Sequence, residues 1–592
     1  MDKNPNKAIA ILVCFFLVMM YKQTVWDPYF NRDLTSPSPI DQGASVSGSY
    51  NQAAKPYSTS PQTTGTQNSG VSAPTSLDNS NAPLPDRPFP TASEIQGKGI
   101  VRVNTTDLSA DITLLGGRLS SVQLESYFKT IDKLERFDLI HKEENVPLPL
   151  GVYRGDLNDA WVQYDLVENE SIVSRSPETQ LLTVDATHGS SERAIILRGT
   201  LPDGSDIRKE FHFANSGYMV GLSVSVIPKD QRQVPLELEW SKYVPLPEIQ
   251  DKYSGSGFVW YDGTRATREK YSDVTAIPIG GNAVRWLTSA DKFFMATIMG
   301  MGTGYNSKVF ALGQGYYSRL LSQNSEENYL LVLAPKSIEI LSSMGNQLEL
   351  NIDLGWMGLI AGPLLYLLHF LYGITGNFGV AIVALTIMVK FSTFFLTSAS
   401  FKQMKAMQDI APDVQKLRES ITDKTQQNAA LMDLYKTKGV NPMGGCLPMF
   451  LQMPIFIGLY TALISDVNLR HAPFAFWIND LSAAESLQVF GFPIPVMVVL
   501  LVISMLIQQW ITPSSMDPTQ KKIMMVMPIF MGFLFMGFPA GLTIYWLTNN
   551  LISIAQSQAL HNGRSAKSAL GVTAFAATGI LLVAVVLAKI SG

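Results

Sequence analysis

The sequence has few of the residues on which most catalytic and metal sites depend. Only two of its 592 residues are cysteine, Cys14 and Cys446, and both lie in apolar segments, which excludes a disulfide framework or a cysteine metal cluster. The six histidines are scattered without a pair at metal-ligand spacing, and no Walker A loop, G-x-S-x-G or H-E-x-x-H motif occurs. With a net charge of −4 and no basic block, the sequence also gives no indication of a nucleic-acid site. We therefore expect neither an enzyme nor a bound cofactor.

What the sequence does have is a series of long hydrophobic runs. Hydrophobic residues make up 46% of the chain, and several runs are long enough to cross a membrane. The first follows Lys3 and Lys7 without a small-residue cleavage site, so residues 1–30 are predicted to be an uncleaved transmembrane anchor. Residues 31–90 are rich in Ser, Thr, Pro, Gln, Asn and Gly, which predicts a disordered linker.

The pattern changes to short alternating stretches between residues 91 and 346. Turn clusters such as Leu201–Ser205 separate these stretches, which indicates a β-sandwich domain, 91–346, with a core of its own. A tethered carbohydrate enzyme is one alternative for such a domain. That alternative needs clustered catalytic side chains, whereas His141, His188 and His212 are isolated in the sequence.

The remaining third of the chain contains the other membrane helices. A helix in residues 347–376 is predicted to lie along the membrane interface. The predicted spans are 377–401, 443–465, 493–511, 523–538 and 542–560, together with an extra C-terminal span in residues 565–592.

Lysine and arginine counts in the short loops set the orientation. Residues 402–440 hold seven of these cations, whereas the loop 466–492 holds only Arg470. Residues 402–440 are therefore predicted to be cytoplasmic and the β-domain periplasmic, in a bacterial inner membrane. Apolar residues recur at helical spacing in 402–440, which predicts a paired helical hairpin; a solvated connector is the alternative.

A single cation, Lys390, lies near the middle of the span 377–401. It is at least about 16 Å from either end, too far for its ammonium to reach the headgroups easily, and a charge at that depth costs about 2.5–3.5 kcal/mol. Thr386, Thr393 and Thr397 share its helical face. The pattern favours a hydrophilic groove, with a tolerated buried lysine as the alternative.

Four long motifs in this part of the chain resemble one known family. The chain is similar to the bacterial membrane insertase YidC, of the family that includes the mitochondrial oxidase-assembly and chloroplast Albino insertases. The resemblance is to the Gram-negative type with a large periplasmic domain. The motifs are Asn441–Phe456, Leu469–Ser482, Asp517–Met524 and Phe538–Tyr545.

The resemblance implies a polytopic α-helical membrane protein with a five-helix core, 377–564, an N-terminal anchor helix and a periplasmic β-sandwich domain. In that core a hydrophilic groove would be open to the cytoplasm and to lipid and closed toward the periplasm. The family usually has arginine where this chain has Lys390. By position the groove would also hold Thr386, Gln452 and Tyr545, and helical spacing adds Thr393 and Asn549. The alternative interpretation of Gln452 is an interhelical hydrogen bond without a role in the groove.

The resemblance also implies how substrates enter the bilayer. Nascent membrane proteins would place a polar segment in the groove, and their helices would slide into lipid, alone or with the Sec translocon. Ribosome–nascent chain complexes and the lipid bilayer are the other expected partners. The predicted slide consists of methionines, whose flexible side chains suit varied sequences, although plain lipid contact is the alternative: Met449, Met453, Met524, Met527 and Met531. A solute transporter or channel subunit remains a rival reading, but it predicts internal repeats and broken helices that the spans lack.

Overall fold

The structure, a computed structural model, describes residues 89–591 apart from short segments at 144, 168–171, 177–180, 188–192, 230–233, 251–254, 442–446, 491, 512–517 and 563–564. The predicted anchor 1–30 and all but the last two residues of the predicted linker 31–90 lie outside the described residues. The described chain forms two compact units, one ending at Asp353 and the other beginning at Leu354.

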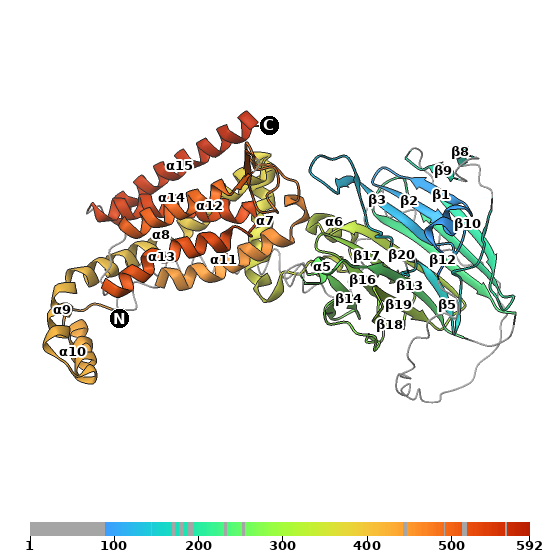
Figure 1. The fold of residues 1–592 in the computed structure, drawn as a ribbon, viewed down its shortest axis with the longest axis horizontal. Helices are drawn as coiled ribbons and strands as arrows, with labels where there is room; N and C mark the ends of the chain where they lie inside the picture. The colour runs from blue at the N-terminus through green and yellow to red at the C-terminus, as the bar shows by residue number, and fades with distance from the viewer. Residues whose placement is uncertain are drawn as a thin grey trace, which may run out of the picture. The chain divides into compact units, whose positions relative to one another are not determined.

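The first unit is built from three β-sheets (Figure 1). The nine-stranded sheet has the order β15 (Ala266–Lys270), β14 (Gly257–Tyr261), β16 (Trp286–Ala290), β17 (Phe294–Gly300), β20 (Glu326–Pro335), β12 (Met219–Ile227), β11 (Asp206–Phe213), β10 (Arg193–Thr200) and β7 (Asp165–Leu166). The six-stranded sheet has the order β4 (Arg136–Asp138), β3 (Leu119–Phe128), β2 (Leu108–Thr113), β1 (Ile100–Asn104), β9 (Leu181–Asp185) and β8 (Ile172–Ser176). The five-stranded sheet has the order β18 (Asn306–Leu312), β19 (Gly315–Ser322), β13 (Leu236–Tyr243), β5 (Gly151–Arg154) and β6 (Leu157–Asn158).

The alternating sequence explains these strands. In β12, for example, Val220, Leu222 and Val224 are buried while the residues between them are partly exposed, as a period of two requires. Three short helices accompany the strands: α4 (Ala92–Gln96) precedes β1, α5 (Leu246–Gln250) joins β13 to β14, and α6 (Ile338–Met344) follows β20.

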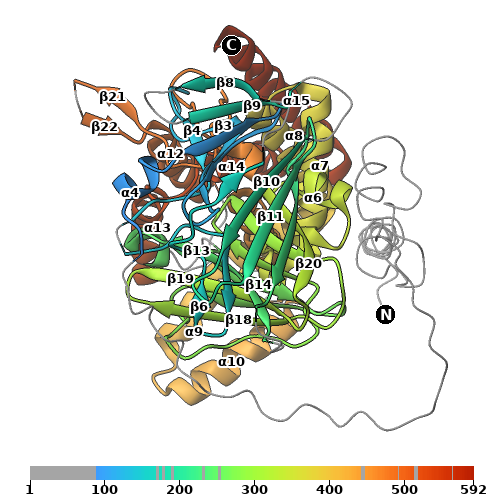
Figure 2. The ribbon, with the colours of Figure 1, turned by 90° about the vertical axis from the view of Figure 1, so that its right-hand side faces the viewer.

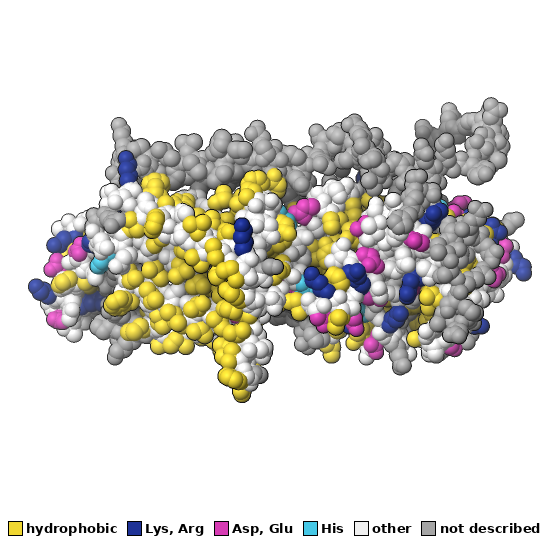
Figure 3. Space-filling model, turned by 90° about the horizontal axis from the view of Figure 1, so that it is seen from above, with side chains coloured by type: hydrophobic (Ala, Val, Ile, Leu, Met, Phe, Trp, Pro, Cys, Tyr) yellow, Lys and Arg dark blue, Asp and Glu magenta, His cyan; other side chains and the backbone are white. Residues whose placement is uncertain are grey.

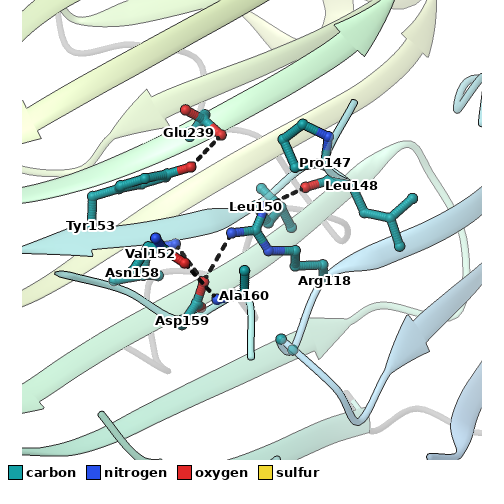
Figure 4. A network of polar contacts seen from close by, with 12 residues as sticks. Arg118, Pro147, Leu148, Leu150, Val152, Tyr153, Asn158, Asp159, Ala160 and Glu239 are labelled. Atoms are coloured by element: carbon teal, nitrogen blue, oxygen red, sulfur yellow. Dashed lines mark hydrogen bonds and ion pairs between the residues drawn. The ribbon is translucent and has the colours of Figure 1, made fainter. Parts of the chain in front are cut away.

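A buried network of charged groups lies inside this unit (Figure 4). The Asp159 carboxylate is fully buried and pairs with Arg118 at 3.2 Å and with Lys209 at 2.6 Å. Lys209 also donates to three backbone carbonyls, and its burial lowers its pKa to about 8. Tyr153 donates to Glu239 at 3.0 Å. Asp159, Lys209, Tyr153 and Glu239 are all paired, whereas Nε of Arg118 is buried without a hydrogen-bond partner among the described residues. The pairs join segments far apart in the sequence and so help to fix how the sheets meet.

The second unit is helical. Its helices are α7 (Gly358–Thr375), α8 (Phe378–Asp409), α9 (Ala411–Ser420), α10 (Lys424–Thr437), α11 (Leu447–Ser465), α12 (Val496–Ile511), α13 (Pro518–Phe535), α14 (Ala540–His561) and α15 (Ala566–Ser591). A two-stranded hairpin, β21 (Leu487–Val489) and β22 (Phe492–Ile494), precedes α12. The short 3-10 helices are η3 (Leu348–Asn351), which ends the first unit, and η4 (Gly355–Met357) and η6 (Val467–Leu469) in this one.

Helices α8 and α14 form the centre of this unit. They pack against each other, α12 and α15 pack on α14, and α7 packs on both α8 and α11. Among the described residues, the helices long and apolar enough to cross a membrane are Gly355–Thr375, Phe378–Asp409 and Ala566–Ser591. Shorter apolar helices occur at Gln452–Ser465, Val496–Ile511 and Met524–Phe535.

Two helix boundaries differ from the sequence prediction. Helix α8 does not end at residue 401 but continues to Asp409, because no proline or glycine interrupts it. The predicted span 493–511 begins as a helix only at Val496, because Phe492–Ile494 pair as a strand with Leu487–Val489. Beyond α8, α9 and α10 pack together through Ile410, Val414 and Leu431.

Candidate functional site

The Lys390 side chain is buried between α8 and α14. Only 7% of Lys390 is exposed, and its Nζ donates to Ser553 Oγ at 2.6 Å. The Ser553 hydroxyl in turn donates to the backbone carbonyl of Asn549, one turn earlier in α14. An ammonium has three donor hydrogens, and no carboxylate lies within ion-pair distance of this one in the part of the chain that the structure describes. Lys390 is thus a buried cation without a counter-charge there.

Polar side chains continue along the face of α14 that meets α8 and α11. Tyr545 is buried and accepts a hydrogen bond from Gln452 Nε2 of α11. Asn549 follows one turn later and is half-buried. Gln556 donates to Thr397 and Ser398 of α8 at 2.9 and 3.0 Å. Together with Ser553, these residues form a polar face of α14, named here the α14 polar face: Tyr545, Asn549, Ser553 and Gln556.

Two of the predicted threonines, Thr386 and Thr393, lie near Lys390 in α8 and make their hydrogen bonds within that helix, whereas Thr397 accepts from Gln556 of α14. Thr386 donates to the Ile382 carbonyl at 2.7 Å, and Thr393 donates to the Val389 and Lys390 carbonyls, both at 3.2 Å. Their hydrogens are therefore used within α8, which leaves the hydroxyl oxygens as acceptors.

Two polar residues of the bundle escaped the sequence analysis. Ser553, the partner of Lys390, lies on the same helical face as Asn549, and this spacing was the available signal. Asn550 is buried and donates to Ser504 of α12 at 3.1 Å, which joins α14 to α12. The pair Asn549-Asn550 in an apolar helix was the signal for this second contact.

The segment 466–485 covers the first turns of α8 and α14. Asn377, the N-cap of α8, accepts from Val380 N and donates to the Phe474 carbonyl at 3.1 Å. Gly541 N donates to the Leu481 carbonyl at 3.0 Å. A Cβ on Gly379 would lie 2.1 Å from the Phe474 ring, so only glycine allows this approach. The segment closes one end of the bundle, and the α9–α10 hairpin, predicted to be cytoplasmic, leads from the other end of α8.

The predicted slide methionines are partly exposed. Met453 of α11 and Met527 of α13 are exposed, Met524 and Met531 are half-buried, and the Met449 side chain lies outside the described residues. Hydrophobic side chains cover much of the visible face of the helical unit (Figure 3).

Helices α11 and α13 have different main partners. Gly458 of α11 lies close to Ile360 of α7, and Gly532 of α13 lies close to Val502 of α12. Neither helix therefore depends mainly on the other for its packing.

Comparisons with known proteins identify the family. Residues 100–367 match the YidC periplasmic domain, and residues 370–567 match the 60Kd inner membrane protein family. The membrane protein insertase YidC of Geobacter metallireducens is 32% identical over 495 residues, covering 81% of this chain and 89% of the relative. The YidC of Syntrophus aciditrophicus is 32% identical over 94% of this chain and 98% of the relative. A crystal structure of an active YidC insertase, with its first transmembrane domain resolved, matches 76% of this chain and 90% of its own at 17% identity and a TM-score of 0.35.

These matches confirm the resemblance, fold class and function that the sequence predicted. The rival reading as a transporter or channel subunit is wrong. The chain belongs to the YidC family of membrane protein insertases, multi-pass inner-membrane proteins with a large β-rich periplasmic domain.

Proposed function

We propose that Lys390 and the α14 polar face hold the polar segment of a nascent membrane protein before its helix enters the lipid. The observation that carries this proposal is a buried ammonium with a single hydroxyl partner, Ser553, and no carboxylate partner among the described residues. Such a cation is costly in a membrane unless a ligand or water completes its contacts. A substrate carboxylate supplies both the charge and the hydrogen-bond acceptor.

Acidic translocated segments are the substrates that gain most from this arrangement. A carboxylate about 4 Å from the ammonium is attracted by about 4 kcal/mol at an effective dielectric constant of about 20, although desolvation offsets part of that gain. The membrane potential also favours outward movement of negative charge, by about 2.3 kcal/mol per charge per 100 mV. No nucleotide needs to be consumed for such a step.

The substrate helix would leave between α11 and α13. Their separate packing on α7 and α12 supports a lateral opening there, because parting them breaks few contacts in the described bundle. Exposed Met453 and Met527 would offer adaptable apolar contacts to helices of varied sequence.

The Sec translocon and the ribosome–nascent chain complex are proposed partners. The α9–α10 hairpin supports ribosome contact, because it extends from the cytoplasmic end of α8 and exposes Met432. It also carries cations in the last turns of its helices, Arg418 and Lys436.

Site-specific crosslinking tests the proposed holding site. A photoreactive residue at Asn549 is expected to crosslink to the polar segment of a stalled nascent substrate. The same residue at Val499, on the exposed face of α12, is expected to give no such product. Crosslinks of equal yield from both positions would contradict a substrate site at the α14 polar face.

The periplasmic β-domain is expected to be dispensable for the insertion step. The two units are separately compact, and Lys390 and its partners all lie in the helical unit. A chain lacking Thr91–Asp353 should therefore still insert a simple substrate, as measured by protease protection in cells depleted of the natural protein. Failure of a stable, correctly oriented deletion protein to insert that substrate would show that the β-domain participates.

A further inference from the structure

The hairpin formed by β21 and β22 has one entirely apolar face. Leu487 pairs with Ile494, and Val489 pairs with Phe492, so these four side chains lie on the same face. No other strand pairs with either strand in the part of the chain that the structure describes. An isolated two-stranded hairpin is only marginally stable in water, which makes an apolar covering for this face important.

The tip of the hairpin is aromatic and unusually exposed. Phe490 is 97% exposed and Phe492 is 73% exposed. Phe490 also has a φ of 51°, a left-handed conformation that Asn, Asp or Gly normally supplies in tight hairpin turns. The Phe490 ring is therefore almost free of contacts with the described protein and is available to an apolar partner outside the chain.

The base of the hairpin is fixed to the bundle. The buried Glu485 carboxylate accepts from Trp477 Nε1 at 2.7 Å and from the backbone N–H of Met497, in the first turn of α12, at 2.6 Å. These contacts tie the ends of the hairpin to the end of the bundle that segment 466–485 closes. Figure 2 shows the hairpin standing out from the helices of this unit.

The hairpin is continuous with a lipid-facing surface. The residues that α12 exposes recur at helical spacing and are all apolar: Val499, Leu500, Ile503, Leu506, Ile507 and Trp510. No charged residue occurs in the sequence between Glu485 and Asp517, so hairpin and helix form one uncharged stretch. Each strand of the hairpin has three residues, so the tip lies about 10 Å from the base. This length matches the depth to which interfacial segments enter a bilayer.

We propose that the β21–β22 hairpin is a membrane anchor whose aromatic tip enters the outer leaflet beside α12. The occupant of the apolar face is phospholipid, at the boundary between headgroups and acyl chains. Because Glu485 links the hairpin to the segment that covers α8 and α14, the anchor sets the height of that segment in the membrane. This inference does not depend on the role of Lys390.

Spin labelling in vesicles tests the anchor. The full chain with Cys14→Ser and Cys446→Ser would receive a nitroxide at Leu487→Cys and be reconstituted, without other proteins, in phospholipid vesicles. The label is expected to be more accessible to oxygen than to a water-soluble nickel chelate, as at the lipid-facing control Ile503→Cys. A label at Leu134→Cys, an exposed site in the β-domain, supplies the aqueous reference.

Removal of the aromatic tip provides the matched variant. Adding Phe490→Ser and Phe492→Ser to the Leu487→Cys chain should raise chelate access toward the Leu134→Cys value. With the tip unchanged, a fluorophore at Leu487→Cys should also be quenched by lipids with brominated acyl chains. With the natural tip, the proposal is overturned if the label at Leu487→Cys is as accessible to the chelate as the label at Leu134→Cys, or if the brominated lipids do not quench the fluorophore. It is also overturned if the label at Leu487→Cys keeps its lipid-like access after both serine substitutions.

Discussion

Lys390→Ala is expected to slow insertion of substrates with acidic translocated segments by about tenfold or more, and to affect neutral substrates much less. A hydrogen bond to a charged group contributes about 1.5–3 kcal/mol, and each 1.36 kcal/mol corresponds to a tenfold change in rate. The Lys390 ammonium has only the Ser553 hydroxyl as a described partner, so a substrate carboxylate adds a contact that no described side chain provides.

Three further variants separate charge from shape. Lys390→Met keeps the length of the side chain without its charge and should behave like Lys390→Ala. Lys390→Arg keeps the charge and should retain insertion. Lys402→Ala removes an exposed cation near the carboxyl end of α8 and serves as the control.

The measurement is protease protection of matched substrates that differ only in the charge of the translocated segment. The comparison requires equal amounts of each insertase variant in cells depleted of the natural protein. If Lys390→Ala inserts acidic and neutral substrates equally well, Lys390 has no electrostatic role in holding the substrate.

The site shows what a single sequence can and cannot predict. The helical period placed Tyr545 and Asn549 on one face of α14, and the depth of Lys390 identified it as a cation remote from the headgroups. The partner of Lys390 was not predictable in the same way. Helical spacing places Ser553 on the same face of α14 as Asn549. That Ser553 lies opposite Lys390 depends on how α8 and α14 pack, and neither helix shows that register in its sequence.

The hairpin before α12 shows a different limit. Its residues are apolar, and apolar composition alone does not distinguish a strand from the first turn of a membrane helix. The usual Asn-Gly signal of a tight turn is absent, because Phe490 occupies the left-handed position. The sequence therefore assigned Pro493 to a helix, whereas the structure pairs it with Gln488. The order of strands in the three sheets was likewise beyond prediction, since it depends on contacts between distant segments.

A reporter fused after Gly592 is expected to lie in the periplasm, an all-or-none result. Helix α15 has 26 residues, about 39 Å of helix, which is enough to cross the hydrocarbon core. Its last residue, Ser591, accepts a hydrogen bond from Phe476 N at 2.9 Å, and Phe476 belongs to the segment 466–485 at the end of the bundle away from the cytoplasmic hairpin. We therefore propose that α15 is an additional membrane helix.

Paired reporters measure this orientation. Alkaline phosphatase after Gly592 should be active and a fluorescent protein that matures only in the cytoplasm should be dark, whereas fusions after His561, at the end of α14, should give the reverse.

Helix α15 packs on α8 and α14 through small buried side chains, Ala569, Thr573, Ala577 and Ala584, which allow close approach in a membrane. None of these residues contributes a hydrogen bond to Lys390 or to the α14 polar face. A chain ending at His561 should therefore lose stability but still insert substrates. In the reporter experiment, a cytoplasmic signal after Gly592 would show that α15 does not cross the membrane.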